Sequence, residues 1–263
     1  MPLLKSEFDA IAPSFDRYRA FPPGVPEAIR SAIRTSMAAP GRPRVLDLGA
    51  GTGRIGKAFV AAGDAYVGVD RSLGMLREFA AQTCAINGRA SFLAQADGEQ
   101  LPFRDRAFDV VLLIQVLSGV RRWRRLLDEA FRVLGAGGTL VVGHAAMPQA
   151  GIDAQLKSQL AIVLQEMGAG LHEPRKNREE ALSWLESVTR TRVNVIAASW
   201  TVNRTPRDFM ARHRTGARFA ALPTPIQEEA LQRLSAWSEA RFGSLDASFP
   251  ESHAFELNIF ESH

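Results

Sequence analysis

The feature that most constrains the fold is a glycine-rich turn that follows a short apolar run. Residues 45–56 read VLDLGAGTGRIG, with glycines at positions 49, 51 and 53. A buried strand that enters a glycine turn and then a helix is the nucleotide-binding arrangement of open α/β sheets. A nicotinamide-binding turn has the spacing G-x-G-x-x-G, because its third glycine lets the helix pack closely on the strand. The spacing here is G-x-G-x-G, so the surrounding residues must identify the ligand.

Strand and helix patterns alternate through the first 144 residues. Apolar strands are expected at 44–50, 65–70, 90–97, 108–117 and 139–144. Such alternation predicts a doubly wound, mostly parallel α/β sheet. Beyond it we expect helices near 151–170 and 177–188, a strand near 191–202, helices near 206–221 and 225–242, and a last strand at 254–261. The predicted fold is therefore a seven-stranded Rossmann-like sheet with a helical lid inserted before the last strand.

Three aspartates stand at or near the carboxyl ends of successive predicted strands. Asp47 precedes the first glycine by two residues, Asp70 ends the second strand and Asp97 ends the third. A carboxylate after the second strand suits the two hydroxyls of a ribose, as in nicotinamide-binding folds. A carboxylate after the third strand suits an adenine edge. Because the turn has no pyrophosphate site, these features indicate an adenosine ligand without phosphates.

Taken in order, the motifs resemble those of a known enzyme family. VLDLGAGTGRIG, VGVDRS, QADGEQLPF, FDVVLLIQVL and FRVLGAGGTLVV look like the successive motifs of class I S-adenosylmethionine-dependent methyltransferases. The nearest resemblance is to the small-molecule group that includes ubiquinone and menaquinone biosynthesis enzymes. It covers about residues 8–142, whereas residues 145–250 carry no family motif. The resemblance implies S-adenosylmethionine as the cofactor and direct in-line methyl transfer to a small-molecule acceptor.

The resemblance also implies roles for single residues. Asp70 would bind the ribose and Asp97 the adenine amine, with Met75 on an adenine face. Gln115 would lie near the sulfonium and Tyr18 near the methionine carboxylate. Core packing is the alternative for Met75 and Tyr18, and helix capping is the alternative for the two aspartates. The implied cofactor contacts are Tyr18, Asp47, Gly49, Ala50, Gly51, Gly53, Asp70, Arg71, Met75, Asp97, Gly98 and Gln115.

The acceptor site is predicted from residues outside the family motifs. His144 ends the fifth strand on the edge where open sheets bind ligands, so it is the candidate general base, with a structural edge histidine as the alternative. Arg212 and Arg218 are candidate ligands for an acidic acceptor, because arginine forks suit carboxylates. Solvated surface is the alternative for both. Methyl transfer from a sulfonium needs orientation of the acceptor and exclusion of water, so no metal is expected.

The chain is expected to form one domain with four parts. Its 263 residues are 46% hydrophobic, which is enough for one large core. No apolar run approaches the roughly 20 residues of a membrane span, and the single cysteine, Cys84, suits a reducing compartment. A cytoplasmic monomer or homodimer is the expectation. The parts are an N-terminal helical cover (1–40), a cofactor-binding core (41–144), a helical segment (145–190) and the lid insertion (203–250).

Two other functions remain open at this point. One is a non-catalytic sensor that binds the cofactor and a partner, and the other is an RNA methyltransferase. The net charge is +4, and the densest basic cluster is RRWRR at 121–125. Such a cluster can meet nucleic acid. The fourth strand, however, ends in LIQVLSGV and lacks the Asn/Asp-Pro-Pro-aromatic sequence of enzymes that methylate base amines. A small-molecule acceptor is therefore favoured over nucleic acid.

Overall fold

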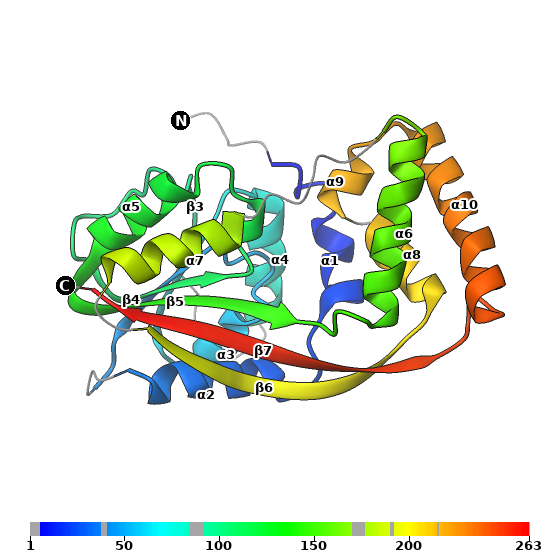
Figure 1. The fold of residues 1–263 in the computed structure, drawn as a ribbon. Helices are drawn as coiled ribbons and strands as arrows, with labels where there is room; N and C mark the ends of the chain where they lie inside the picture. The colour runs from blue at the N-terminus through cyan, green and yellow to red at the C-terminus, as the bar shows by residue number, and fades with distance from the viewer. Residues whose placement is uncertain are drawn as a thin grey trace.

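A seven-stranded sheet forms the centre of the computed structural model, which describes residues 6–37, 41–84, 92–169, 177–189, 192–214 and 216–262. The strands are β1 (Arg44–Leu48), β2 (Ala65–Asp70), β3 (Phe92–Gln95), β4 (Phe108–Ile114), β5 (Leu134–Ala146), β6 (Arg192–Arg204) and β7 (Phe249–Glu261). Their order is β3-β2-β1-β4-β5-β7-β6 (Figure 1). The first five strands are parallel, and β7 is antiparallel to both of its neighbours. The predicted mostly parallel Rossmann-like sheet is confirmed.

The last three strands in the sheet order are longer than the sequence pattern predicted. Each of β5, β6 and β7 has 13 residues. The pairing of β7 with β6 begins at Phe249 and Arg204, before the alternating apolar pattern of the last strand starts. Figure 1 shows this part of the ribbon reaching past the sheet toward a group of helices. The extra ladder hydrogen bonds join the inserted helices to the sheet.

Helices cover both faces of the sheet. They are α1 (Ala12–Arg19), α2 (Val25–Thr35), α3 (Gly56–Ala61), α4 (Leu73–Cys84), the 3-10 turn η1 (Leu117–Gly119), α5 (Trp123–Val133), α6 (Ile152–Glu166), α7 (Asn177–Val188), α8 (Pro206–Arg214), α9 (Ala217–Ala220) and α10 (Thr224–Phe242). One face is covered by α5 and α7, through buried side chains such as Leu127 and Leu185. The other is covered by α2, α3 and α4, through Ile33, Phe59 and Phe79. Burial on both faces explains the continuous apolar runs of the parallel strands.

Four helices, α6, α8, α9 and α10, form a separate helical unit with its own core. Leu160 of α6, Phe209 of α8 and Leu234 of α10 belong to one buried cluster. Figure 1 shows α6 and α10 side by side at one end of the molecule. The sequence predicted one helical segment over 145–190, but α6 packs in this unit, whereas α7 packs on the sheet through Ala181 and Leu185. No helix in the described ranges is long and apolar enough to cross a membrane.

Candidate active site

The three glycines of the turn are used for different purposes. Gly49, Gly51 and Gly53 all have left-handed backbones, with φ of 81°, 55° and 78°. A Cβ at Gly49 would lie 2.5 Å from Val116, and one at Gly53 would lie 2.3 Å from the Phe79 ring. A Cβ at Gly51 would meet only the carbonyl oxygen of Gly49, at 4.0 Å. The outer two glycines therefore permit close packing, while the middle one borders open space that a ligand can enter.

Asp70, at the end of β2, is joined directly to the turn. The Gly51 amide donates to its Oδ2 at 2.9 Å, and the Ser72 amide donates to its Oδ1 at 2.8 Å. Burial raises the pKa of the Asp70 carboxyl despite these hydrogen bonds. An ionised carboxylate has about four lone-pair sites, so further donors can bind. The expected ribose-binding residue thus lies beside the open side of the turn.

Asp47 lies beneath the turn and is almost completely buried, with 2% of its surface exposed. The Tyr66 hydroxyl donates to its Oδ2 at 2.7 Å. Its Oδ1 is buried and has no hydrogen-bond partner among the described residues. Burial raises the pKa of the Asp47 carboxyl to about 7. The unpartnered oxygen is compatible with the predicted contact to a cationic or hydrogen-bonding ligand group.

The segment that precedes and includes α1 lies over the turn and the start of α4. Ser72 Oγ and the Gly74 amide both donate to Asp9 Oδ1, at 2.6 and 2.9 Å. The Thr52 hydroxyl donates to Asp16. The hydrogen bonds from Ser72 and Gly74 lower the pKa of the Asp9 carboxyl. Neither aspartate was predicted as a site residue, although both lie in the predicted N-terminal cover (1–40).

Arg54, which directly follows the third glycine, was also missed. Its Nη2 donates to Oε1 of Gln115 at 2.6 Å, and its Nη1 donates to the carbonyl oxygen of Arg19 at 2.9 Å. The guanidinium lies 5.3 Å from the Phe15 ring centroid and 5.1 Å from that of Phe21. Burial lowers the pKa of Arg54 to about 10. Arg54 thus joins the turn, the end of β4 and α1.

The end of β4 has an unusual backbone. Gln115 has a φ of 58°, one of two positive values at described non-glycine residues, and its amide donates to the Gly143 carbonyl at 2.8 Å. Residues outside glycine adopt this region at a cost, and such strain is concentrated at functional sites. The side chain of Gln115 is thereby directed to Arg54, near the turn. This is the place at which the sequence predicted the sulfonium.

The other predicted cofactor contacts have mixed surroundings. Asp97 is half-buried, and its Oδ1 accepts the Glu99 amide at 3.0 Å. A Cβ at Gly98 would lie 2.5 Å from Leu126, so packing on α5 explains this glycine. Met75 is 3% exposed, as a core residue would be, and the Arg71 side chain is exposed.

Tyr18 of α1 is half-buried, and its ring lies 5.4 Å from the Arg17 guanidinium. Ala50, between the first two glycines, is buried in the core that includes Phe79. The surroundings of these residues do not distinguish a cofactor contact from a packing role, so their roles as cofactor contacts remain predictions.

His144 lies at the expected end of β5, beside the antiparallel strand β7. Its Nε2 is 3.5 Å from Oε2 of Glu256. Its Nδ1 is buried and has no hydrogen-bond partner among the described residues. Burial, and then the charge of Arg178, lower the pKa of the imidazole. A neutral imidazole with an unused nitrogen can accept a proton.

Of the two arginines expected to bind an acidic acceptor, Arg212 has a protein partner. Arg212 donates from Nη1 and Nη2 to the two carboxylate oxygens of Asp153, at 2.7 and 2.6 Å. This carboxylate belongs to α6, which the sequence analysis did not place against α8. It occupies the guanidinium fork that was expected to bind an acidic acceptor. The side chain of Arg218 lies outside the described residues.

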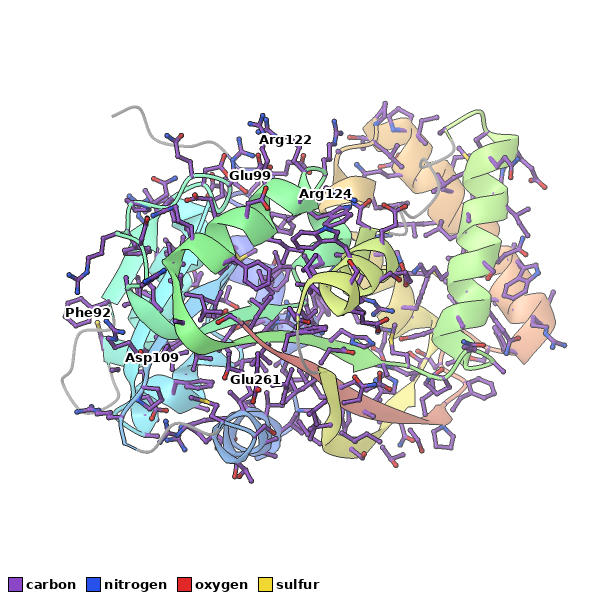
Figure 2. The ribbon with its side chains drawn as sticks, turned by 60° about the vertical axis from the view of Figure 1, so that its left-hand side comes forward. Phe92, Glu99, Asp109, Arg122, Arg124 and Glu261 are labelled. Carbon is purple, nitrogen blue, oxygen red and sulfur yellow. The ribbon has the colours of Figure 1, made fainter. Side chains whose placement is uncertain are left out.

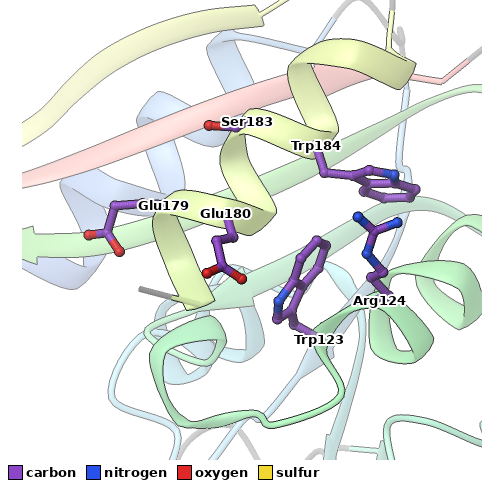
Figure 3. Close-up of a pocket in the computed structure, with 6 residues that line it drawn as sticks. All are labelled: Trp123, Arg124, Glu179, Glu180, Ser183 and Trp184. Carbon is purple, nitrogen blue, oxygen red and sulfur yellow. The ribbon is translucent and has the colours of Figure 1, made fainter. Parts of the chain in front are cut away.

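The basic cluster at 121–125 has protein partners. Arg122 forms a 2.6 Å ion pair with Glu99, and both lie near Arg124 in Figure 2. The Arg124 guanidinium lies over the rings of Trp123 and Trp184, 5.0 and 5.8 Å from their centroids (Figure 3). These contacts account for Arg122 and Arg124 without a nucleic-acid partner.

Three features of the fold and the site together define the class of protein. They are a Rossmann-like sheet with β7 antiparallel, a G-x-G-x-G turn and a carboxylate at the end of β2. Residues 46–142 match the family model described as "Methyltransferase domain". This part of the chain is therefore similar to the class I S-adenosylmethionine-dependent methyltransferases, as its motifs predicted. The cofactor of that class is S-adenosylmethionine.

Curated relatives share this part of the chain. A demethylmenaquinone methyltransferase of Clavibacter sepedonicus is 36% identical over 142 residues, which are 54% of this chain and 57% of the relative. A ubiquinone/menaquinone biosynthesis C-methyltransferase UbiE of Syntrophotalea carbinolica is 34% identical over 146 residues, 54% of this chain and 60% of the relative. The similarity thus spans little more than half the length of these relatives.

Solved structures extend the similarity of fold to most of the chain. The YcgJ protein of Bacillus subtilis has a TM-score of 0.58 and 18% identity, over 90% of this chain and 98% of its own. The [4+2]-cyclase SpnF has a TM-score of 0.50 and 19% identity, over 90% and 81%. At this identity the similarity establishes the fold alone.

Proposed function

We propose that the protein transfers a methyl group from S-adenosylmethionine to a small molecule. The observation that carries the proposal is the hydrogen bond between Gly51 and Asp70, which places a carboxylate at the open side of a G-x-G-x-G turn. This arrangement lies within the region that matches the methyltransferase domain. It provides the contacts that an adenosine ligand without phosphates requires.

The residues present fit the cofactor. The space beside Gly51 admits a ligand to the backbone, and the buried Oδ1 of Asp47 is left without a protein partner among the described residues. Asp70 would accept the ribose hydroxyls, and Asp97 would accept the adenine amine. Gln115, held by Arg54, would stand near the sulfonium. When bound, the cofactor supplies an electrophilic methyl group.

The protein's part is to orient the acceptor and to exclude water. The segment from Ser6 to Arg19 lies over the turn through Asp9 and Asp16. Its helix α1 also contacts α8 of the helical unit, so the two covering parts meet. We infer that together they close the carboxyl edge of the sheet around the reactants.

The acceptor we propose is a small, partly apolar molecule. The relatives are named for demethylmenaquinone and for ubiquinone/menaquinone biosynthesis, and quinones of these types combine a ring with an apolar tail. A substituted hydroquinone is therefore the first acceptor to test. The helical unit lies outside the matched domain, so its residues decide which ring and which tail are accepted.

Calorimetry tests the cofactor site. We expect S-adenosylhomocysteine to bind and NAD to give no heat of binding. Asp70→Ala removes charge-assisted hydrogen bonds worth about 1.5–3 kcal/mol each, so affinity for S-adenosylhomocysteine should fall at least about tenfold. Asp109→Ala is the matched control, because Asp109 pairs with Arg44 at the opposite end of the sheet. Equal affinity in the Asp70 variant and the control would contradict the site.

A transfer assay separates an enzyme from a cofactor-binding sensor. The protein is incubated with methyl-labelled S-adenosylmethionine and a reduced demethylmenaquinone analogue, and the label in the organic phase is measured. We expect enzyme-dependent labelling that Asp70→Ala reduces. Tight cofactor binding without labelling of this analogue or of a phenol panel would favour the sensor.

A further inference from the structure

The sheet has two edge strands, and they differ in length. β3 has four residues, whereas β6 has 13. Among the described residues β6 pairs only with β7, so its other side presents a row of backbone N–H and C=O groups (Figure 1). A very short edge strand gives a further strand little to pair with. β6 is therefore the edge that can accept another strand.

The sequence of β6 lacks the usual protection of an edge strand. Charged side chains, lysine above all, and proline commonly keep edge strands from pairing with other chains. β6 reads RVNVIAASWTVNR, with an arginine at each end and neither a charge nor a proline between them. Two of its large apolar side chains, Val193 and Ile196, are 48% and 67% exposed. A long, apolar and uncharged edge indicates a partner that pairs with this strand.

A bulge divides β6 into two parts. Ile196 pairs with Glu256 of β7 and Ala198 pairs with Phe255, so Ala197 has no partner in the ladder. A bulge bends its strand and increases the local twist, so the pairing of an added strand ends there. Both exposed apolar side chains precede the bulge. The part of β6 that can accept a strand is therefore the segment 192–196.

We propose that the segment 192–196 pairs with the same segment of a second copy of this chain, antiparallel and across a twofold axis at Asn194. This register places Val193 opposite the partner's Val195, and the symmetry repeats the contact. Opposite residues of an antiparallel pair lie on one face, and alternation puts Val193 on the same face as Val195. Val195 already packs on the core that α2 covers, so the four valines extend that core across the axis. The two seven-stranded sheets become one.

The sequence of the segment favours a second copy over an unrelated strand. Its V-N-V is symmetrical about Asn194, so an apolar residue of one copy always meets an apolar residue of the other. Pairing over the whole of β6 would instead set Arg192 opposite the partner's Arg204, and like charges at opposite positions are destabilising. The twofold contact uses the β6 edge of both copies, and β3 is too short to continue the sheet. The assembly therefore closes as a dimer.

Sedimentation equilibrium of the full chain tests the contact. We expect wild type to be dimeric at micromolar concentrations, and Val193→Lys and Ile196→Lys each to raise the dissociation constant at least about tenfold, because symmetry applies each change twice. Ile162→Lys is the matched control, because Ile162 of α6 is also 48% exposed but lies outside the sheet. A monomeric wild type, or Lys variants of β6 that dimerise as well as the control, would overturn the proposal.

Disulfide formation tests the register. In an antiparallel pair the Cα atoms of opposite residues lie roughly 4.5–5.5 Å apart, which is within the range of a disulfide. In a Cys84→Ser background, Asn194→Cys should therefore oxidise to a covalent dimer. Thr201→Cys is also exposed on β6 but follows the bulge, so it should stay monomeric under the same oxidation. Equal yields of covalent dimer from the two variants would overturn the twofold pairing at Asn194.

Discussion

At the scale of single residues, burial decides how the charges of this site behave. Asp47 and Asp70 both have raised pKa values, whereas the pKa of Asp9 is lowered by its hydrogen bonds. The two buried carboxylates are therefore less stable in their charged forms while no cationic group faces them. A cationic ligand group beside Asp47 would reverse this effect. The site thus leaves a carboxyl oxygen, Oδ1 of Asp47, available to a ligand.

Asp47 makes the stability of the ligand-free protein fall as pH rises. The folded carboxyl keeps its proton up to about pH 7, whereas the unfolded one ionises near 3.8. Between these values the folded state binds more protons, so the free energy of unfolding decreases with pH. We expect the free energy of unfolding of wild type, relative to that of Asp47→Asn, to fall by up to about 1.4 kcal/mol per pH unit between pH 4 and 7 in urea unfolding.

The carboxylate of Asp109 provides a control, because its contribution to stability should depend on pH in the opposite direction. Arg44 lowers the pKa of Asp109. The stability that Asp109 contributes is therefore present above about pH 4 and is lost as pH falls. A difference between wild type and Asp47→Asn that stays constant from pH 4 to 7 would mean that the folded Asp47 is ionised throughout.

Two separate requirements make position 53 a glycine. Its φ of 78° penalises any Cβ, and a Cβ there would lie 2.3 Å from the Phe79 ring. Gly137 has a similar φ of 67° but nothing within 4 Å. We expect Gly53→Ala to lower the free energy of unfolding by roughly 1–3 kcal/mol more than Gly137→Ala, because only the first also overpacks the core. Equal losses in urea unfolding would mean that Phe79 moves away freely.

At the scale of secondary-structure elements, one buried fork joins α6 to α8. Asp153 is 6% exposed and binds Arg212 through both oxygens, with Arg204 at 3.5 Å. Removing one partner of a buried pair costs about 3–5 kcal/mol, because the other charge stays buried alone. We expect Asp153→Ala to lower the free energy of unfolding by about 3 kcal/mol, since the Arg212 side chain keeps 15% exposure.

A second aspartate–arginine fork supplies the control for that prediction. Asp246 binds Arg207 with similar distances, 2.6 and 2.8 Å, but both side chains are exposed. Exposed pairs contribute little, so Asp246→Ala should leave the urea midpoint unchanged. If both variants lose the same stability, burial is not what gives the Asp153 fork its strength.

At the scale of the whole molecule, hydrogen bonds connect the turn to the helical unit. Arg54 binds Gln115 and the Arg19 carbonyl, and Nη2 of Arg19 donates to the Arg212 carbonyl at 2.9 Å. Arg212 then binds Asp153. The helix α1 is therefore the physical link between the glycine turn and the helical unit.

Cofactor binding should therefore slow amide exchange in α8 and α6 as well as in the turn. Elements that cover a site come from the less stable part of a fold, so their exchange responds to added ligand. We expect saturating S-adenosylhomocysteine to protect α8 at least severalfold in wild type. In Arg54→Gln the turn should still be protected, but α8 should not. Protection of α8 in both proteins would mean that the link runs through other contacts.

Much of this protein follows from short stretches of sequence, because a strand, its turn and the following helix are contiguous. Residues 45–56 predicted the turn, and the aspartates at strand ends predicted which edge of the sheet binds the ligand. The mostly parallel seven-stranded sheet was predicted and is confirmed, whereas its strand order and the antiparallel β7 came only from the structure. Arg54 lies within the motif itself, directly after the third glycine, but no local sequence rule assigns a partner to an arginine at that position.

By itself, then, the sequence indicated the class of fold through its alternating patterns and the glycine turn through residues 45–56, and the resemblance of its motifs implied the cofactor. Only the tertiary structure decided that α6 packs in the helical unit while α7 packs on the sheet. Both helices have an apolar face, and an apolar face can be buried against a sheet or against other helices. The tertiary structure also decided the partners of the charged residues. Arg19 and the Arg212 carbonyl are 193 positions apart, and Asp153 and Arg212 are 59 apart. Such pairs form only when distant segments pack, so no local pattern records them.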